Sequence, residues 1–189
     1  MGLDQRLVTL SVCGAAALAA CGSTTVLSSW KAPGPPPTFH KMLVVAASKD
    51  PSLRRAAEDD FAARNANVTP SYQVIPENEI GNAEAIRARV KAGGFDGAVV
   101  MRVTSVDKEQ SWVPGGWGYS YWPGGLWAEP GYMQTDTRVR VETNVYSVPD
   151  DRLVWSSATQ TVNTASVRSL VKDTAVAVDK EMRKQGFVP

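Results

Sequence analysis

The residue with the most distinctive potential chemistry is Cys21, because the residues before it prepare its thiol for modification. Arg6 precedes an apolar run from Leu7 to Ala20, and small residues end that run. A short charged start, an apolar stretch and small residues before a cleavage point are the parts of a secretory signal peptide. The sequence therefore predicts a signal peptide over residues 1–20.

The segment Leu18-Ala19-Ala20-Cys21 resembles the lipobox of bacterial lipoproteins, a leucine followed by two small residues and a cysteine. The resemblance implies that the thiol of Cys21 is diacylated, that the chain is cut before it, and that the freed amine is usually acylated too. This covalent lipid is the only expected cofactor. Gly22 and Ser23 follow where enterobacterial lipoproteins of the inner membrane carry aspartate, so the resemblance favours the outer membrane, facing the periplasm.

An uncleaved membrane helix and an ordinary signal peptide are the alternatives to a lipobox. The run from Leu7 to Ala20 has 14 residues, whereas a helix that crosses a bilayer needs about 20. Cleavage before Cys21 leaves 169 residues (189 minus 20), and it removes Cys13. The expected mature protein thus has no free thiol and no disulfide framework.

Candidate catalytic and metal-binding residues are few. The only histidine, His40, is expected to be an exposed surface residue, and no serine lies in a Gly-x-Ser-x-Gly turn. The carboxylates of Glu58-Asp59-Asp60 are expected on a solvated helix face, and residues 93–97 fit a helix end and turn better than a phosphate loop. We therefore predict that the protein is not an enzyme and holds no metal.

The net charge also limits the class of partner. The formal charge is +1, and the basic residues form no block larger than Arg54-Arg55. This pattern argues against nucleic acid as a partner.

The most unusual segment is rich in tryptophan, tyrosine and glycine and is expected to be a long loop over residues 109–133. Three interpretations compete: a self-packed loop over the sheet, a surface that contacts a partner protein, and a sugar-binding surface. Only Glu129 is charged between Ser111 and Tyr132. This disfavours the sugar-binding interpretation, because few polar groups are available to bind sugar hydroxyls. Tryptophan and tyrosine dominate interface hot spots. The candidate contact residues are Trp112, Trp117, Tyr119, Tyr121, Trp122 and Trp127.

The elements that must position this loop begin after a tether. Residues 21–40 contain serine, threonine and a proline cluster, which predicts a flexible or semi-rigid tether on which Trp30 could still dock. A single domain is expected over residues 41–189. Its first half predicts strands over 42–47, 68–75 and 97–103, separated by helices that Asp50-Pro51 and Asn82 begin. Such an alternation predicts parallel strands.

The second half changes period. Residues 137–146 alternate between apolar or threonine side chains and polar ones, which predicts a half-buried antiparallel strand paired with residues 153–162. An apolar stripe from Val167 to Met182 predicts a last helix. The predicted fold class is therefore α/β, an α+β sandwich with a mixed sheet from a βαβαβ half, an antiparallel hairpin and a C-terminal helix.

This pattern resembles a loose group of small bacterial envelope lipoproteins. The resemblance lies in Lys41–Val45, Leu53–Asp59, Gly94–Val100 and Leu153–Ser156. Related arrangements occur in the lipoproteins that activate penicillin-binding proteins, in the N-terminal domain of the Tol β-propeller protein and in the curli secretion lipoprotein.

The resemblance implies an α/β domain that meets envelope partners and performs no chemistry. We expect a lipid-anchored protein that binds or scaffolds an envelope protein through the aromatic loop, or through the hairpin face bearing Arg138 and Arg140. The alternatives are a self-assembling structural lipoprotein and a binder of carbohydrate such as peptidoglycan or lipopolysaccharide.

Overall fold

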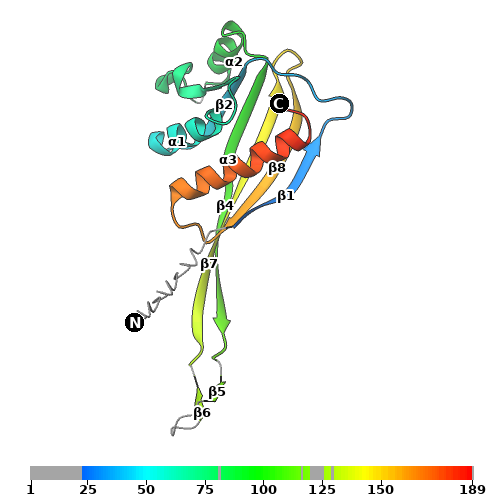
Figure 1. The fold of residues 1–189 in the computed structure, drawn as a ribbon. Helices are drawn as coiled ribbons and strands as arrows, with labels where there is room; N and C mark the ends of the chain where they lie inside the picture. The colour runs from blue at the N-terminus through cyan, green and yellow to red at the C-terminus, as the bar shows by residue number, and fades with distance from the viewer. Residues whose placement is uncertain (1–22, 81, 116, 120–125, 129, 189) are drawn as a thin grey trace, which may run out of the picture.

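The fold is an α/β sandwich built on a mixed sheet, as the sequence predicts (Figure 1). The computed structural model describes residues 23–80, 82–115, 117–119, 126–128 and 130–188. In these residues a six-stranded sheet has the order β1-β8-β7-β4-β2-β3, and β5 and β6 form a separate two-stranded ladder. The strands are β1 (Ser23–Lys31), β2 (Met42–Ala47), β3 (Val68–Pro70), β4 (Gly97–Val113), β5 (Trp117–Tyr119), β6 (Leu126–Ala128), β7 (Tyr132–Ser147) and β8 (Arg152–Val162).

The βαβαβ half is parallel, and the remaining strands are antiparallel. Strand β2 pairs in parallel with β3 on one side and with β4 on the other. Strands β7, β8 and β1 then extend the sheet by antiparallel pairing. Strand β3 stops at Pro70, earlier than the predicted 68–75, and a 3₁₀ turn over Ser71–Gln73 follows it; a second 3₁₀ turn spans Glu77–Glu79.

In the described part of the chain three α-helices cover the sheet, and each begins at a capped residue. Helix α1 (Pro51–Ala62) starts where the Asp50 side chain accepts from the backbone N–H groups of residues 52 and 53. Helix α2 (Ala83–Ala92) is capped by Asn82, and α3 (Val167–Lys184) by a capping box at Ser166.

The apolar strand β2 separates two cores, which explains why its sequence is continuously apolar. Met42, Val44 and Ala46 pack in the larger core under α1 and α3. On the opposite face Leu43 packs with Ile75, Val90 and Phe95, in the core next to α2.

Strand β1 corrects the expectation of a tether over the whole of residues 21–40. Residues 23–31 pair with β8 along its length, from Ser23 opposite Val162 to Lys31 opposite Trp155. Ser29 fixes this strand to α3, because its hydroxyl donates to Glu181 (3.2 Å) and accepts from the Gln185 amide (2.9 Å). The folded domain therefore begins two residues after Cys21.

Glu58 corrects the expectation that the acidic run of α1 is solvated. Its side chain is fully buried, whereas Asp59 is exposed. One carboxylate oxygen accepts from Arg54 Nε (3.1 Å) and from the hydroxyl of Ser71 (2.6 Å). The carboxylate also accepts from the backbone N–H of Ala46 (3.0 Å) and that of residue 72 (3.1 Å). Glu58 thus joins α1 to β2 and to the 3₁₀ turn after β3.

Candidate functional site

The candidate site is a two-stranded arm that leaves the sheet (Figure 1). Strand β2 stops pairing with β4 at Arg102, and β8 stops pairing with β7 at Arg138. Beyond these points β4 and β7 pair only with each other, down to Val113 opposite Tyr132. We call residues 108–113 and 132–137 the arm.

The arm corrects the predicted loop over residues 109–133. Residues 109–113 belong to β4, and residues 132–133 belong to β7. Within the remainder, Trp117–Tyr119 and Leu126–Ala128 pair as antiparallel strands. The predicted loop is therefore largely the continuation of a long hairpin.

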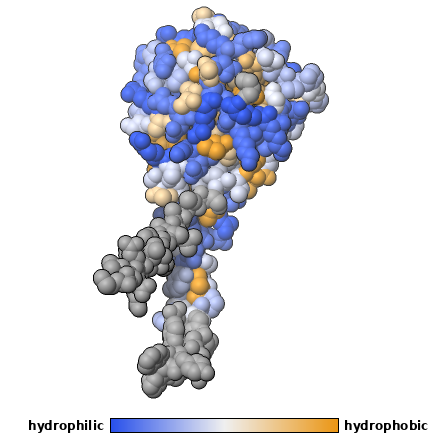
Figure 2. Space-filling model, viewed as in Figure 1, coloured by the Kyte–Doolittle hydropathy of each residue, from blue (hydrophilic) through white to orange (hydrophobic). Residues whose placement is uncertain are grey.

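The end of the arm exposes large apolar side chains. Trp112 and Met133 lie directly opposite each other, and they are 61% and 56% exposed. Tyr132, on the other face, is 59% exposed. Figure 2 shows hydrophobic residues on the arm immediately before its grey end. The Trp112 ring lies against Gly131, where an added Cβ would come within 2.3 Å of it.

The two faces of the hairpin differ near its base. Val106 lies opposite Val139, which belongs to the core under α1 and α3, and alternation places Trp112 and Met133 on the same face. The opposite face carries ion pairs, Arg102 with Glu142 (2.8 Å) and Arg138 with Glu109 (2.7 Å).

Asn163 holds the base of the arm to the end of β8. Its side-chain oxygen accepts from the N–H of Thr137 (2.9 Å), and its side-chain nitrogen donates to Asp136 (2.7 Å). Asn163 has a φ of 52°, a left-handed conformation in which asparagine is enriched. The sequence does not predict this role for Asn163; its one signal is an asparagine directly after a β-rich run.

The same contacts predict an acid-sensitive arm base. Hydrogen bonds from Asn163 and from Gln134 lower the pKa of Asp136 below 3.8. Because this pKa is lower in the folded than in the unfolded protein, the stabilisation is present at neutral pH and is lost as pH falls from 3.8 through the folded-state pKa. Hydrogen exchange of the Thr137 amide, corrected for its intrinsic rate, should lose protection over this range. Asn163→Ala should reduce protection at neutral pH, and pH-independent protection in the parent protein would contradict the prediction.

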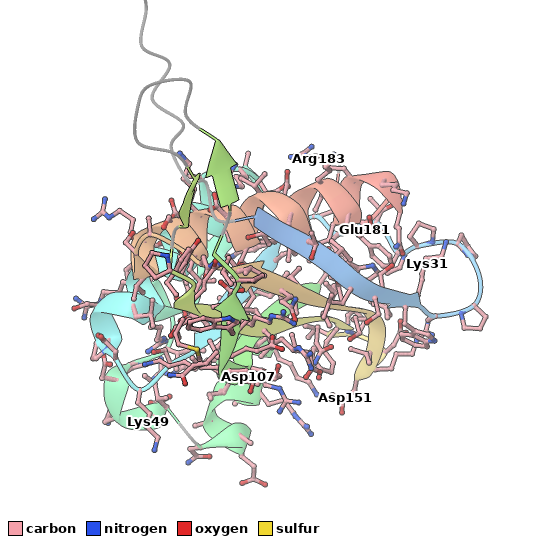
Figure 3. The ribbon with its side chains drawn as sticks, turned by 90° about the horizontal axis from the view of Figure 1, so that it is seen from below. Lys31, Lys49, Asp107, Asp151, Glu181 and Arg183 are labelled. Atoms are coloured by element: carbon pink, nitrogen blue, oxygen red, sulfur yellow. The ribbon has the colours of Figure 1, made fainter. Side chains whose placement is uncertain are left out.

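The register places the start of β1 at the base of the arm. Ser23 lies opposite Val162, Val162 lies opposite Arg138, and Arg138 lies opposite Asp107. Figure 3 views the domain from the end at which the arm projects, with Asp107 in the central part of the view and Lys31, at the other end of β1, far to one side. Ser23 thus begins the described fold at the end of the sheet from which the arm leaves.

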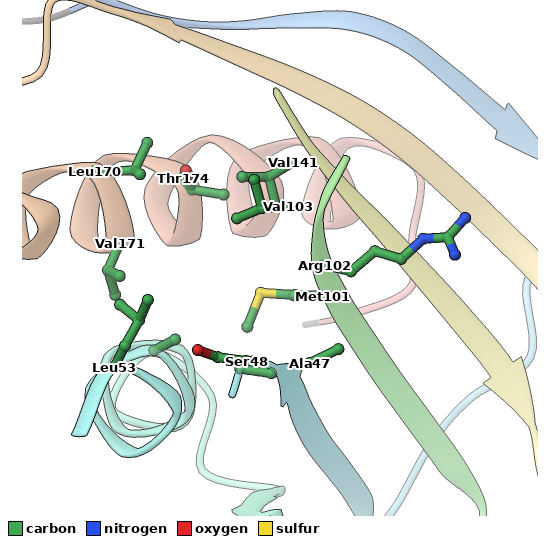
Figure 4. A pocket seen from close by; sticks show the side chains of 12 residues that line it. Ala47, Ser48, Leu53, Met101, Arg102, Val103, Val141, Leu170, Val171 and Thr174 are labelled. Atoms are coloured by element: carbon green, nitrogen blue, oxygen red, sulfur yellow. The ribbon is translucent and has the colours of Figure 1, made fainter. Parts of the chain in front are cut away.

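A small apolar pocket lies between α1, α3 and the sheet (Figure 4). Its volume is about 70 Å³, below the 300–1,000 Å³ typical of small-molecule sites. Leu53, Met101, Val103 and Leu170 line it, and the Thr174 hydroxyl beside them has no hydrogen-bond partner in the described residues. The lining is mainly apolar, and its polar residues are Ser48, Arg102 and Thr174.

The structure places the predicted site residues as follows. Trp112 lies exposed on β4, Trp117 and Tyr119 lie on β5, and Trp127 lies on β6. Cys21, Tyr121 and Trp122 lie outside the described residues.

The candidates outside the loop are also located. His40 is exposed, and its backbone N–H donates to Asp96 (2.7 Å). Arg140 donates to Gln160 (3.2 Å) on the open sheet face. Within the described part of the chain, no group of three histidine, cysteine, aspartate or glutamate residues is placed to hold a metal, and no helix is long and apolar enough to cross a membrane.

Comparison with known proteins gives no family. No family model matches the chain, and no curated protein matches it. Similar solved structures include a PelC dodecamer from Paraburkholderia phytofirmans, 14% identical over 82% of this chain and 96% of that chain with a TM-score of 0.46. A PelC variant from the same organism is 15% identical over 83% and 95%, with a TM-score of 0.47. The lipoprotein GNA1162 from Neisseria meningitidis is 19% identical over 76% and 98%, with a TM-score of 0.39.

None of the three is named as a penicillin-binding-protein activator, a Tol protein or a curli secretion lipoprotein, the groups that the sequence pattern resembles. With each TM-score below 0.5, they assign this chain neither a family nor a function.

Proposed function

We propose that this chain is a lipid-anchored protein of the bacterial envelope that works by contact rather than catalysis. The acyl chains on Cys21 hold the domain at the outer membrane, on its periplasmic side. The contact surface is the end of the arm. The alternatives from the sequence are a self-assembling structural lipoprotein and a carbohydrate binder that would use the aromatic segment.

One observation supports this proposal most strongly. The arm exposes Trp112, Tyr132 and Met133 while it projects from the end of the sheet at which Ser23 begins. Exposed aromatic residues on a projecting element are costly in water, and they supply large contact areas when a partner covers them. The lipobox-like residues before Cys21 support the anchor.

The anchor is tested on the full-length protein made in a bacterial host. Intact mass spectrometry of the membrane-extracted protein should show a chain that begins at Cys21 and carries two or three acyl chains. Cys21→Ser should abolish the added mass and move the protein from the membrane fraction to the soluble fraction. A membrane-extracted protein without added acyl mass would overturn the anchor.

A further inference from the structure

Strand β1 is an edge strand with little protection against pairing with another chain. It pairs with β8 on one side, and within the described residues no strand pairs with its other side. Edge strands usually carry charges or proline, or are very short, because their free N–H and C=O groups can pair with another strand. Residues 23–30 contain no charged residue and no proline. A bulge between Val26 and Ser28 is the only irregularity in the described pairing of β1.

A groove lies beside this edge, between β1 and α3, and its volume is about 720 Å³. The residues that line it include Thr24 and Val26 of β1 and Asp173, Val176, Ala177 and Lys180 of α3. Val26 is 37% exposed and Val176 is 42% exposed. The groove therefore leaves apolar surface in water directly beside a free strand edge.

The charges of α3 along this groove are complementary to the same charges in the reverse direction. Asp173, Ala177 and Lys180 follow one another at spacings of four and three residues, so they lie on one face of the helix. The ion pairs that α3 forms with described residues include neither Asp173 nor Lys180. If two α3 helices pack antiparallel with Ala177 at the centre, Asp173 of each copy lies beside Lys180 of the other. Alanine at the centre allows the two helices to approach closely.

The sheet sets the distance between two such helices. The end of α3 is hydrogen-bonded to both outer strands, because Glu181 accepts from Ser29 of β1 (3.2 Å) and Gln185 accepts from Trp155 of β8 (3.1 Å). Paired strands lie about 4.8 Å apart. If β1 pairs with β1 of a second copy, two helices that each lie midway between β1 and β8 are two strand spacings apart, about 10 Å. Packed helices lie about 8–10 Å apart.

We propose that β1 pairs antiparallel with β1 of a second copy of this chain, and that α3 packs against α3 of that copy with Ala177 near the two-fold axis. Both copies then use the same surface, as a two-fold interface requires. The inference goes beyond the proposed function, because β8 lies between β1 and β7 in the sheet and the arm stays outside this interface. A two-fold axis perpendicular to the sheet keeps the two Ser23 residues at the same height along that axis, which is compatible with two anchors in one leaflet.

Cysteine crosslinking of the full-length protein in intact bacterial cells tests the second copy. A disulfide requires Cα atoms within about 7 Å, a condition that Ala177→Cys meets only if the two copies pack at this position. Lys172→Cys is the matched control, because residue 172 is exposed on the same helix and its two copies would lie about 15 Å apart along the helix axes. The parent chain shows any contribution from Cys21. Mild oxidation should give a dimer of twice the chain mass for Ala177→Cys and little dimer for the control or the parent.

Charge reversal in the Ala177→Cys protein tests the register of the two helices. Lys180→Asp should lower the crosslinked fraction several-fold, because it places like charges beside each other, and the further change Asp173→Lys should restore crosslinking. Circular dichroism shows that each variant is folded. Absence of a dimer at residue 177, equal crosslinking at residues 177 and 172, or no restoration by the second charge reversal would overturn the inference. An adduct of residue 177 with a different protein would overturn the second copy as the partner of this surface.

Discussion

Replacing Trp155 by alanine is expected to lower the free energy of unfolding by about 3–5 kcal/mol, because this ring is among the largest fully buried side chains. Its Nε1 donates to Gln185 (3.1 Å), and its ring lies 6.2 Å from that of Phe187 between centroids. The substitution removes these contacts and leaves a cavity between β8 and the end of α3. Equilibrium unfolding in urea, with the midpoint and slope both fitted, measures the loss.

Trp30→Ala is the matched control, because it makes the same change on the neighbouring strand β1. Trp30 is 49% exposed and lies opposite Ser156, next to Trp155 along β8. Its removal should cost clearly less than that of Trp155. If the two variants lost similar stability, the core would not be centred where the structure places it.

Glu58→Gln is the second substitution with a large expected effect. It leaves the Arg54 guanidinium, itself only 4% exposed, without its buried counter-charge. Removal of one member of a buried ion pair typically costs about 3–5 kcal/mol, because the remaining charge stays buried and uncompensated. Thermal unfolding followed by circular dichroism should show a midpoint about 10 °C lower.

Asp59→Asn controls for the change of carboxylate to amide one residue further along α1. Asp59 is exposed and accepts from the Tyr72 hydroxyl (2.7 Å), a bond that an asparagine oxygen can retain. This variant should unfold close to the parent protein. Parent-like stability of Glu58→Gln would show that the buried network contributes little.

The sequence predicts the buried half of the fold well because burial leaves a pattern. Met42–Ala47 is apolar throughout since helices cover both of its faces. The alternation from Val139 to Val145 follows from one covered and one open face. Asp50, Asn82 and Ser166 mark helix starts by the chemistry of their caps.

The sequence predicts the arm and β1 poorly because neither segment has a regular alternation of buried and exposed residues. Both faces of the arm are open to solvent, so residues 108–113 show no period of two, and prolines and glycines nearby favour a loop. Strand β1 lies at the sheet edge and pairs with only one other strand, so its serines and threonines resemble a linker. From sequence Glu58 is predicted to be a surface residue, because its contacts with Arg54 and Ser71 form only in the folded structure.

The amino-acid composition therefore identifies the candidate site, and only the strand topology shows where it lies. The aromatic residues identify the segment from sequence alone. Its distance from the anchor follows only from the register that joins Ser23 to Asp107 across two intervening strands. No sequence pattern contains that relation.

The most direct measurement is photo-crosslinking in intact cells with a photoreactive residue at Met133, beside a control at the exposed Arg55 of α1. The account predicts an adduct with an envelope component at residue 133 and none at residue 55. Equal adducts at residues 133 and 55 would show contact that is not specific to the arm. If residue 133 gives no adduct while the protein is anchored and folded, the central claim that the arm is the contact surface is contradicted.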